Sequence, residues 1–209
     1  MIHRLVRTTM QWTGLAATAA VFLAIASGPA VAAEWAIDAG HSSAQFKVRH
    51  LMVSTVTGSL GKVTGAIQYD PADPTKSSVE ANIDTTTITT AHEARDNHLK
   101  SPDFFDVAKF PAITFKSKKV EKSGDGRLKV TGDLTMKGVT KEVALDVEGP
   151  MTPVAVGGGN LASGLTATTK INRQDFGVSW SKTMDGGGLV VSDEVTITID
   201  LEIKQKKQG

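Results

Sequence analysis

The feature that most constrains the fold is a period-two alternation of apolar and polar residues along most of the chain. Successive side chains of a strand point to opposite faces, so this alternation indicates strands with one buried face. In the clearest run five apolar residues alternate with polar ones: Val195, Ile197, Ile199, Leu201 and Ile203. Seven earlier runs show the same pattern, around residues 44–48, 63–69, 79–83, 113–115, 128–134, 139–147 and 161–171. We therefore predict about eight strands.

Turn-forming sequences separate many of the predicted strands. They stand at residues 70–74 (DPADP), 123–126 (SGDG), 137–138 (KG) and 185–188 (DGGG). Successive strands have no helical pattern between them, which favours an antiparallel sheet. Eight such strands fit either a sandwich or a closed barrel. A barrel leaves no exposed strand edge, and its interior can hold one small ligand.

Two stretches interrupt the strand pattern. The first is a helical insert at about residues 91–108, where Thr90 and Glu93 form a capping box with Thr90 as the N-cap. Ser101-Pro102-Asp103 predicts a second short helix, which carries two phenylalanines. Such an insert is expected to close one end of a barrel or to flank its mouth. The second stretch, Gly149 to Asn160, contains three consecutive glycines and is predicted to be a mobile loop without regular structure.

The N-terminal segment has the three parts of a secretory signal peptide. Basic residues precede an apolar stretch, and Ala30-Val31-Ala32 matches the small-x-small cleavage rule. The alternative is an uncleaved anchor, but the apolar stretch is short for a membrane span. We predict cleavage after Ala32 or Ala33, leaving residues 33–209 as a single domain. The compartment implied by this export is the periplasm.

Composition and motifs argue against several chemistries. Residues 33–209 carry 21 basic and 22 acidic side chains, a net charge of −1 that gives no basic surface for nucleic acid. The chain has no cysteine, which excludes thiol catalysis. His92 and His98 are six residues apart, about 240° around a helix, so they do not form the two-histidine zinc motif. There is no nucleophile elbow and no phosphate-binding glycine motif. We expect no enzyme activity, no metal and no cofactor.

The apolar residues suggest a pocket with few polar groups. Alternation places seven of them on inward faces: Phe46, Val48, Ile113, Phe115, Leu165, Ile197 and Ile199. Phe104 and Phe105 lie on the helical insert, and Phe176 and Trp180 belong to the last hairpin. We predict that a subset of these residues lines an elongated cavity. For any single residue the alternative is ordinary core packing.

Charged residues of the insert and of the last hairpin are predicted to be structural. Arg95, Asp96 and His98 lie within one helical turn, where we expect them to dock the helix on the barrel. Arg173 and Asp175 are expected to pin the last hairpin.

The chain resembles the YceI-like family, the extended-lipocalin proteins that bind polyisoprenoids in the bacterial periplasm. Five motifs carry the resemblance: 41–51 (HSSAQFKVRHL), 93–105 (EARDNHLKSPDFF), 110–115 (FPAITF), 132–141 (GDLTMKGVTK) and 171–177 (INRQDFG). The resemblance implies an all-β, eight-stranded antiparallel lipocalin-like barrel with a helix near one end. It also implies an elongated cavity for an isoprenoid, quinone-like or fatty-amide chain.

The expected function is therefore non-catalytic binding of a long-chain isoprenoid or similar lipid. Two alternatives remain open. One is an enzyme acting on an isoprenoid head group through His98, Arg95 or Arg173. The other is a structural or chaperone-like barrel with a filled interior. Expected partners are the lipid itself and, transiently, a membrane, with no nucleic acid; the protein is expected to be a monomer or a dimer.

Overall fold

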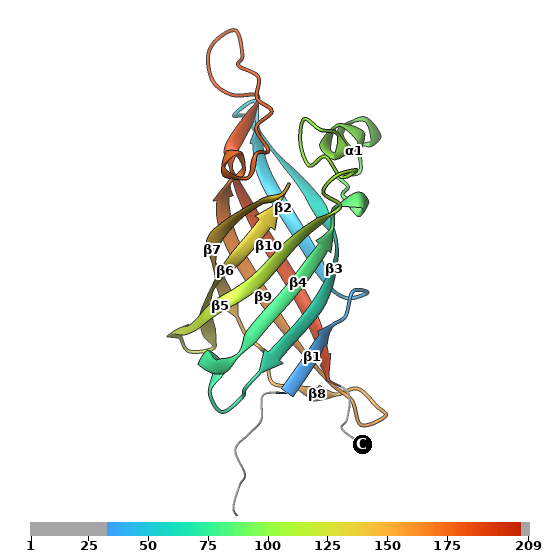
Figure 1. Ribbon diagram of the computed structural model, residues 1–209, viewed down its shortest axis with the longest axis vertical. Helices are drawn as coiled ribbons and strands as arrows, with labels where there is room; N and C mark the ends of the chain where they lie inside the picture. The colour runs from blue at the N-terminus through green and yellow to red at the C-terminus, as the bar shows by residue number, and fades with distance from the viewer. Residues whose placement is uncertain (1–32, 206–209) are drawn as a thin grey trace, which may run out of the picture.

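Eight long antiparallel strands curl into a closed barrel, and two short strands complete its wall (Figure 1). This computed structural model describes residues 33–205, so the predicted signal peptide lies outside the described residues. The strands are β1 (Ala33–Ile37), β2 (Ser43–His50), β3 (Ser54–Tyr69), β4 (Ser78–Asp84), β5 (Ala112–Gly124), β6 (Arg127–Met136), β7 (Val139–Glu148), β8 (Val154–Ala155), β9 (Leu161–Asn172) and β10 (Val191–Gln205). The predicted eight-stranded antiparallel barrel is confirmed.

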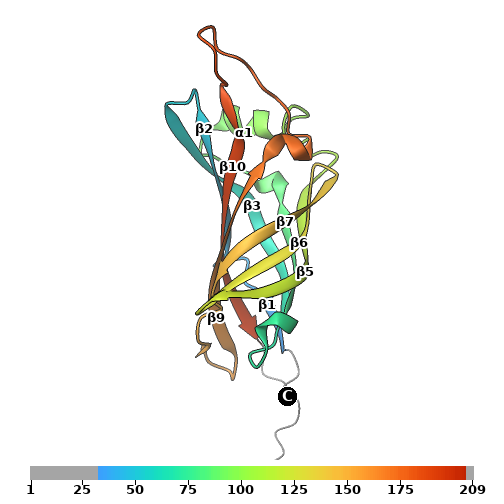
Figure 2. The same ribbon diagram turned by 90° about the vertical axis from the view of Figure 1, so that its left-hand side faces the viewer.

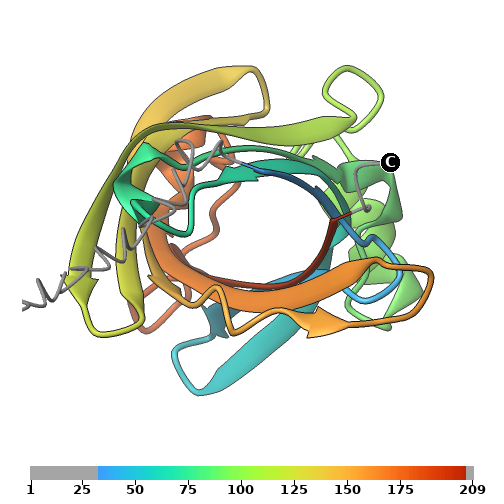
Figure 3. The same ribbon diagram turned by 90° about the horizontal axis from the view of Figure 1, so that it is seen from below.

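The barrel closes through β10, which pairs with β2 on one side and with β9 on the other. Viewed from below, the strands form a complete ring (Figure 3). Val195 of β10 lies opposite Val48 of β2 and Ile171 of β9. Each of the eight long strands thus has two hydrogen-bonded neighbours, although β7 pairs with β9 only over Asp146–Glu148, and this leaves few edges for pairing with another chain.

The two short strands were not predicted. β1 pairs with both β3 and β10 and occupies the gap between them beyond the end of β2. β8 pairs with the start of β9. The prediction that Gly149–Asn160 lacks regular structure is therefore wrong at Val154–Ala155, where the loop runs alongside β9 closely enough to pair with it.

The alternation predicted only the second half of β3. The residues that face the interior change from even-numbered to odd-numbered positions at Gly61, so the strand does not show one continuous period. Val56, Gly58 and Leu60 share one parity, whereas Val63 and Ile67 share the other, and the pairing with β2 shifts its register at this point. A β-bulge inserts one extra residue into a strand. The side chains before and after it can then face the same side of the sheet although their positions differ in parity.

Further along β3, Gly65 sits where only glycine fits. Its φ is +143°, and a Cβ atom there would lie 2.2 Å from the carbonyl oxygen of Glu80 on β4. The strand can therefore approach β4 this closely only without a side chain at this position.

Helix α1 (Glu93–Lys100) lies at one end of the barrel, called the upper end here as in Figure 1. Its N-cap is His92, whose Nδ1 accepts a hydrogen bond from the Arg95 backbone N–H at 3.3 Å. The prediction of Thr90 as N-cap is wrong. The Thr90 hydroxyl is bonded to Asp96 and Arg95 instead, and Ala91 has a left-handed backbone, φ +57°, which separates Thr90 from the helix.

The predicted second helix after Ser101 is a series of turns. The backbone N–H groups of Phe105 and Val107 donate to the carbonyls of Leu99 and Lys100, so the chain folds back on the end of α1. Asp106 has φ +48°, a left-handed conformation that ends any helical run. Within residues 33–205, the structure has no helix that is both long and apolar enough to span a membrane.

Candidate functional site

The interior of the barrel holds two adjoining cavities along its length. The upper cavity has a volume of about 260 Å³ and lies beneath α1, and the lower cavity has a volume of about 110 Å³. Leu60, Met136 and Ile197 line both, so these three side chains mark the junction. An apolar chain that entered at the upper end would meet the lower cavity on passing this junction.

Both cavities are lined mainly by apolar side chains. Among the described residues, the upper lining has four polar members, which are His50, Arg95, His98 and Arg173. The lower lining has hydroxyl groups from serine, threonine and tyrosine residues but no charged side chain in the described part of the chain. The two cavities therefore differ in polarity, because all the arginine and histidine side chains of their described linings belong to the upper one.

Ten of the eleven residues predicted to line a cavity do so. The upper cavity is lined by Phe46, Val48, Phe104, Phe105 and Trp180. The lower cavity is lined by Ile113, Phe115, Leu165 and Ile199, and Ile197 contributes to both. Phe176 is 2% exposed and belongs to the packed core, outside both linings. Whether these residues contact a ligand stays a prediction.

Several lining residues were missed. Val56 and Leu60 lie on the part of β3 that was not predicted, although Val56, Gly58 and Leu60 do alternate with polar neighbours. Val178 and Val190 come from the long connection between β9 and β10, which shows no periodic pattern, and Val191 is the first residue of β10.

An aromatic cluster joins α1 to that connection at the upper end. The His98 ring stands edge-on to Phe104, with centroids 4.9 Å apart, and edge-on to Trp180, at 5.2 Å. Phe104 and Trp180 are 5.4 Å apart. His98 Nε2 also lies 2.9 Å from an Asp103 carboxylate oxygen. Because these rings line the upper cavity, they form part of its roof as well as fixing the helix.

Arg95 and Asp96 tie α1 to the segment that precedes it. The Asp96 carboxylate accepts from the Thr89 hydroxyl at 2.8 Å and from the Thr90 backbone N–H at 2.7 Å. The Arg95 guanidinium donates to the Thr90 hydroxyl and carbonyl. Thr89 in turn pairs with Ser59 of β3. The helix is therefore attached to the barrel wall through these threonines, as the predicted polar network requires.

The pKa of the Asp96 carboxyl is lowered. Burial raises it, but the hydrogen bonds from Thr90 and Thr89 together outweigh that effect. A carboxyl whose pKa is lower in the folded state stabilises the fold above its unfolded pKa of about 4 and loses this contribution as the pH falls through the folded value.

Asp96→Asn should therefore be less stable than wild type at neutral pH, and the difference should shrink as the pH falls below about 4 and through the lowered pKa of Asp96, where the wild-type carboxyl itself becomes protonated. Thermal unfolding followed by circular dichroism across this pH range measures the difference. Asp125→Asn, in the exposed β5–β6 turn, is the matched control and should show little difference at any pH. A constant difference between Asp96→Asn and wild type across the range would contradict this linkage.

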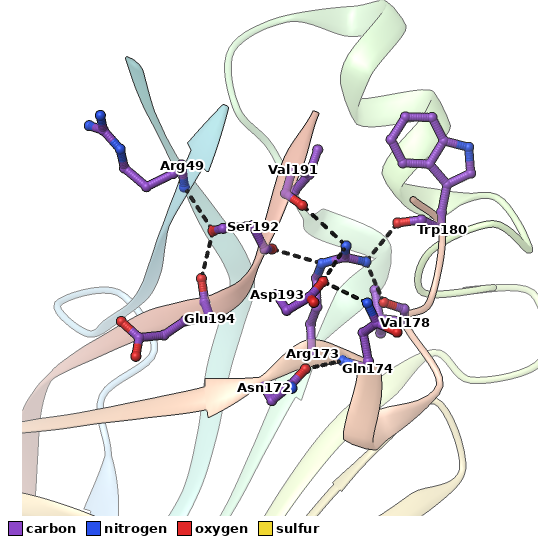
Figure 4. A network of polar contacts seen from close by, with 10 residues as sticks. All are labelled: Arg49, Asn172, Arg173, Gln174, Val178, Trp180, Val191, Ser192, Asp193 and Glu194. Atoms are coloured by element: carbon purple, nitrogen blue, oxygen red, sulfur yellow. Dashed lines mark hydrogen bonds and ion pairs between the residues drawn. The ribbon is translucent and has the colours of Figure 1, made fainter. Parts of the chain in front are cut away.

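Arg173 forms the most extensive polar network at the upper end (Figure 4). Its Nε donates to the Ser192 carbonyl, Nη1 donates to the Val178 and Trp180 carbonyls, and Nη2 donates to the Val191 carbonyl and to Asp193. The side chain lies on the 3-10 helix Arg173–Phe176, and the residue is 4% exposed. Burial lowers the pKa of the guanidinium, and Asp193 opposes that shift.

All five N–H donors of Arg173 are therefore committed to the protein itself. The predicted pinning of the last hairpin by Arg173 matches this geometry, but the predicted part of Asp175 in it is wrong. Asp175 is exposed and has no hydrogen bond or ion pair with any described residue. It points away because it follows Arg173 by two residues on a 3-10 turn, whereas Asp193 of β10 faces the guanidinium.

A second cluster of titratable groups lies at the opposite end, where Asp38, His41 and Glu202 come together. The Lys204 ammonium contacts Asp38 and lies 3.2 Å from Glu202, while His41 Nδ1 lies 2.8 Å from Asp38. The hydrogen bond from Lys204 holds the pKa of the Asp38 carboxyl far below its usual range. The Lys204 ammonium is therefore the cation that pairs with the Asp38 and Glu202 carboxylates.

Comparison with known sequences finds the same domain over nearly all of the described chain. The sequence profile of the YceI-like domain matches residues 35–203. A UPF0312 protein of Staphylococcus aureus is 38% identical over 165 residues, covering 79% of this chain and 94% of the relative. A UPF0312 protein of Vibrio cholerae is 38% identical over 174 residues, covering 82% and 89%.

Solved structures share the fold. The YceI protein of Campylobacter jejuni is 32% identical, with a TM-score of 0.65, over 76% of this chain and 90% of that one. Burkholderia cenocepacia BcnA is 24% identical, with a TM-score of 0.66, over 79% and 98%. A polyisoprenoid binding domain from Saccharophagus degradans, implicated in plant cell wall breakdown, is 15% identical, with a TM-score of 0.59, over 84% and 99%. At identities below 25%, the likeness concerns the fold alone.

Proposed function

Because this chain belongs to the YceI-like family, we propose that it is a non-catalytic binding protein that holds a long apolar lipid inside its barrel. The observation that carries the proposal is the pair of adjoining apolar cavities, which follow one another along the barrel and share three lining residues. The Saccharophagus degradans domain, which is described as polyisoprenoid binding, has the same fold and supports this ligand class.

The chemistry of the lining favours a chain with one polar end. Arg95 uses two of its five N–H donors on Thr90 and forms no ion pair with a described residue, so it retains donors at the upper cavity. The lower cavity offers no charged group within residues 33–205. We propose that the apolar tail of the ligand, an isoprenoid, quinone-like or fatty-amide chain, lies in the lower cavity and its polar end lies near α1.

The proposed non-catalytic role is supported by how the polar groups are used. Arg173 has no free donor, and His98 is held by Asp103 and by two aromatic rings. A head-group enzyme that used Arg173 would need its donors to be free for charge stabilisation, and of the three candidate groups Arg95 alone keeps N–H donors without a partner among the described residues. We also propose that the protein is exported to the periplasm, since residues 1–32 have the composition of a signal peptide.

Burial energetics predict that affinity rises with chain length. Each isoprene unit contributes about 3 kcal/mol gross, taking about 0.8 kcal/mol per buried methylene equivalent. Association costs roughly 4–15 kcal/mol, so one or two units are not expected to suffice.

The test is direct binding of prenols of increasing length to delipidated protein, followed by intrinsic fluorescence. We expect weak binding of chains of one or two units and a steep gain for chains long enough to pass Leu60 and Met136.

The protein should be purified from its own cell, where export predicts Ala33 or Glu34 as the first residue. Equal binding of all lengths, or none of any, would refute a lipid-binding interior.

A further inference from the structure

The turn between β2 and β3 exposes three consecutive apolar side chains at the upper end. Leu51 is 38% exposed, Met52 52% and Val53 78%. Figure 2 shows this hairpin projecting at the same end as α1 and the connection into β10. Isolated exposed apolar residues are common on soluble proteins, but a run at the tip of a projecting hairpin marks a contact surface.

The backbone of this turn makes the choice of residues more informative. The Val53 N–H donates to the His50 carbonyl at 3.1 Å, with Leu51 and Met52 at the two central positions. Their φ values are +51° and +60°, and a turn with two such positions strongly prefers Asn-Gly. Leucine and methionine there cost stability through backbone strain, and their side chains recover little of it by burial. The requirements of the turn therefore do not explain why leucine and methionine occupy these two positions.

This apolar tip is continuous with the mouth of the upper cavity. The Leu51 N–H donates to the Val190 carbonyl at 2.8 Å, and His50, Val190 and Val191 line the cavity. A lipid leaving the barrel past these residues would therefore meet the tip next.

Cationic side chains without ion-pair partners flank the tip. Lys47 and Arg49 are exposed on the outward face of β2, and neither pairs with a carboxylate in residues 33–205. The Arg49 guanidinium donates to the Met52 carbonyl and the Thr55 hydroxyl, which braces the turn. The nearby carboxylates of Asp193 and Glu194 are already paired with Arg173 and Lys170. The region thus combines an apolar tip with an unneutralised positive flank.

The exposed apolar residues at the opposite end have different surroundings. Met151 and Val154 share a shallow surface hollow with the carboxylates of Asp200 and Glu202. The described lining of this hollow contains no lysine or arginine, so it lacks the attraction to anionic lipid that Lys47 and Arg49 give the upper end.

We propose that the β2–β3 tip, Leu51 to Val53, docks the protein on an anionic lipid bilayer, with its apolar side chains entering the interface and Lys47 and Arg49 facing the head groups. An apolar tip with basic residues beside it is the composition of interfacial membrane contacts. This docking rests on the proposed lipid-binding function, because it gives an insoluble ligand a path between bilayer and barrel that avoids water.

The test uses Leu51→Asn with Met52→Gly, which removes the apolar tip but supplies the residues that the turn prefers. We expect the doubly substituted protein to be at least as stable as wild type in thermal unfolding. Its partitioning onto vesicles of phosphatidylethanolamine and phosphatidylglycerol, measured by co-sedimentation, should fall at least about tenfold. Val154→Ser with Val156→Ser, at the opposite end, is the matched control and should partition as wild type does.

Wild type should also partition less onto phosphatidylcholine vesicles, and added salt should weaken its binding to the anionic ones. The docking proposal is overturned if wild type ignores anionic vesicles, if the tip substitutions leave partitioning unchanged, or if they only dissociate a dimer in sedimentation velocity. Binding of a long prenol presented in detergent should be the same with and without the substitutions. Failure of wild type in that assay would refute the lipid-binding function instead.

Discussion

Replacing Arg173 with leucine is expected to lower the free energy of unfolding by about 3 kcal/mol or more, because several polar groups lose the same buried hydrogen-bond partner at once. The substitution deletes five N–H donors and leaves four backbone carbonyls without that partner, together with the Asp193 carboxylate. Each buried polar group left unsatisfied costs about 1–3 kcal/mol, although water can reach those near the surface.

Urea unfolding followed by tryptophan fluorescence measures this loss. Asp175→Ala, two residues along the same 3-10 helix, is the matched control, and a change within about 0.5 kcal/mol is expected because Asp175 is exposed and unpaired with any described residue. Arg173→Lys should be intermediate, since an ammonium keeps the charge but has only three donors and cannot reach all the acceptors placed around the edge of the guanidinium group. A stable Arg173→Leu protein would mean that the connection between β9 and β10 holds without this anchor.

Val48→Trp is expected to reduce the affinity for a long prenol at least about tenfold, or about 1.4 kcal/mol. Val48 lies in the wall of the upper cavity, paired with Val56 on β3 and with Val195 on β10, and both of these also line the cavity. An indole at this position would occupy space that the ligand needs. The strand pairing should survive, because the cavity accepts the added volume.

Gln45→Trp provides the control, because Gln45 is exposed on the outward face of the same strand. It adds the same bulk outside the barrel, so binding should stay within about twofold of wild type. Far-ultraviolet circular dichroism checks that both variants keep the sheet. If Val48→Trp binds the prenol as wild type does, the ligand does not pass through the upper cavity.

The sequence predicts the barrel well wherever the alternation is unbroken. The run from Val195 to Ile203 identifies β10 and its inward face, because all the apolar residues of this run stand at odd-numbered positions. Parity is lost where a strand bulges, and this is why the first half of β3, before Gly61, was not predicted. β1 and β8 have only five and two residues, too short to show a period.

The candidate site was only partly predictable, because much of it depends on distant contacts. Alternation placed Phe46 and Ile197 correctly on the interior, but it cannot say which inward residue faces a cavity and which, like Phe176, fills the core. Asp193 was missed as the partner of Arg173 because the two are 20 residues apart and meet only when β10 is in place. The capping box at Thr90 had the right composition, yet Asp96 competes for the same hydroxyl.

The closure of the barrel by β10 has a consequence for folding kinetics. Ser42 and Glu202 bond to each other across 160 positions of the chain, so the ring is completed by contacts of very high sequence separation. Proteins dominated by such contacts fold slowly, because the entropy of closing a long loop is lost before the contact forms. Until β10 arrives, β2 and β9 each present an unpaired edge, which makes the nearly finished barrel prone to aggregation. A folding helper that shields these two strands would therefore act at the last step of assembly.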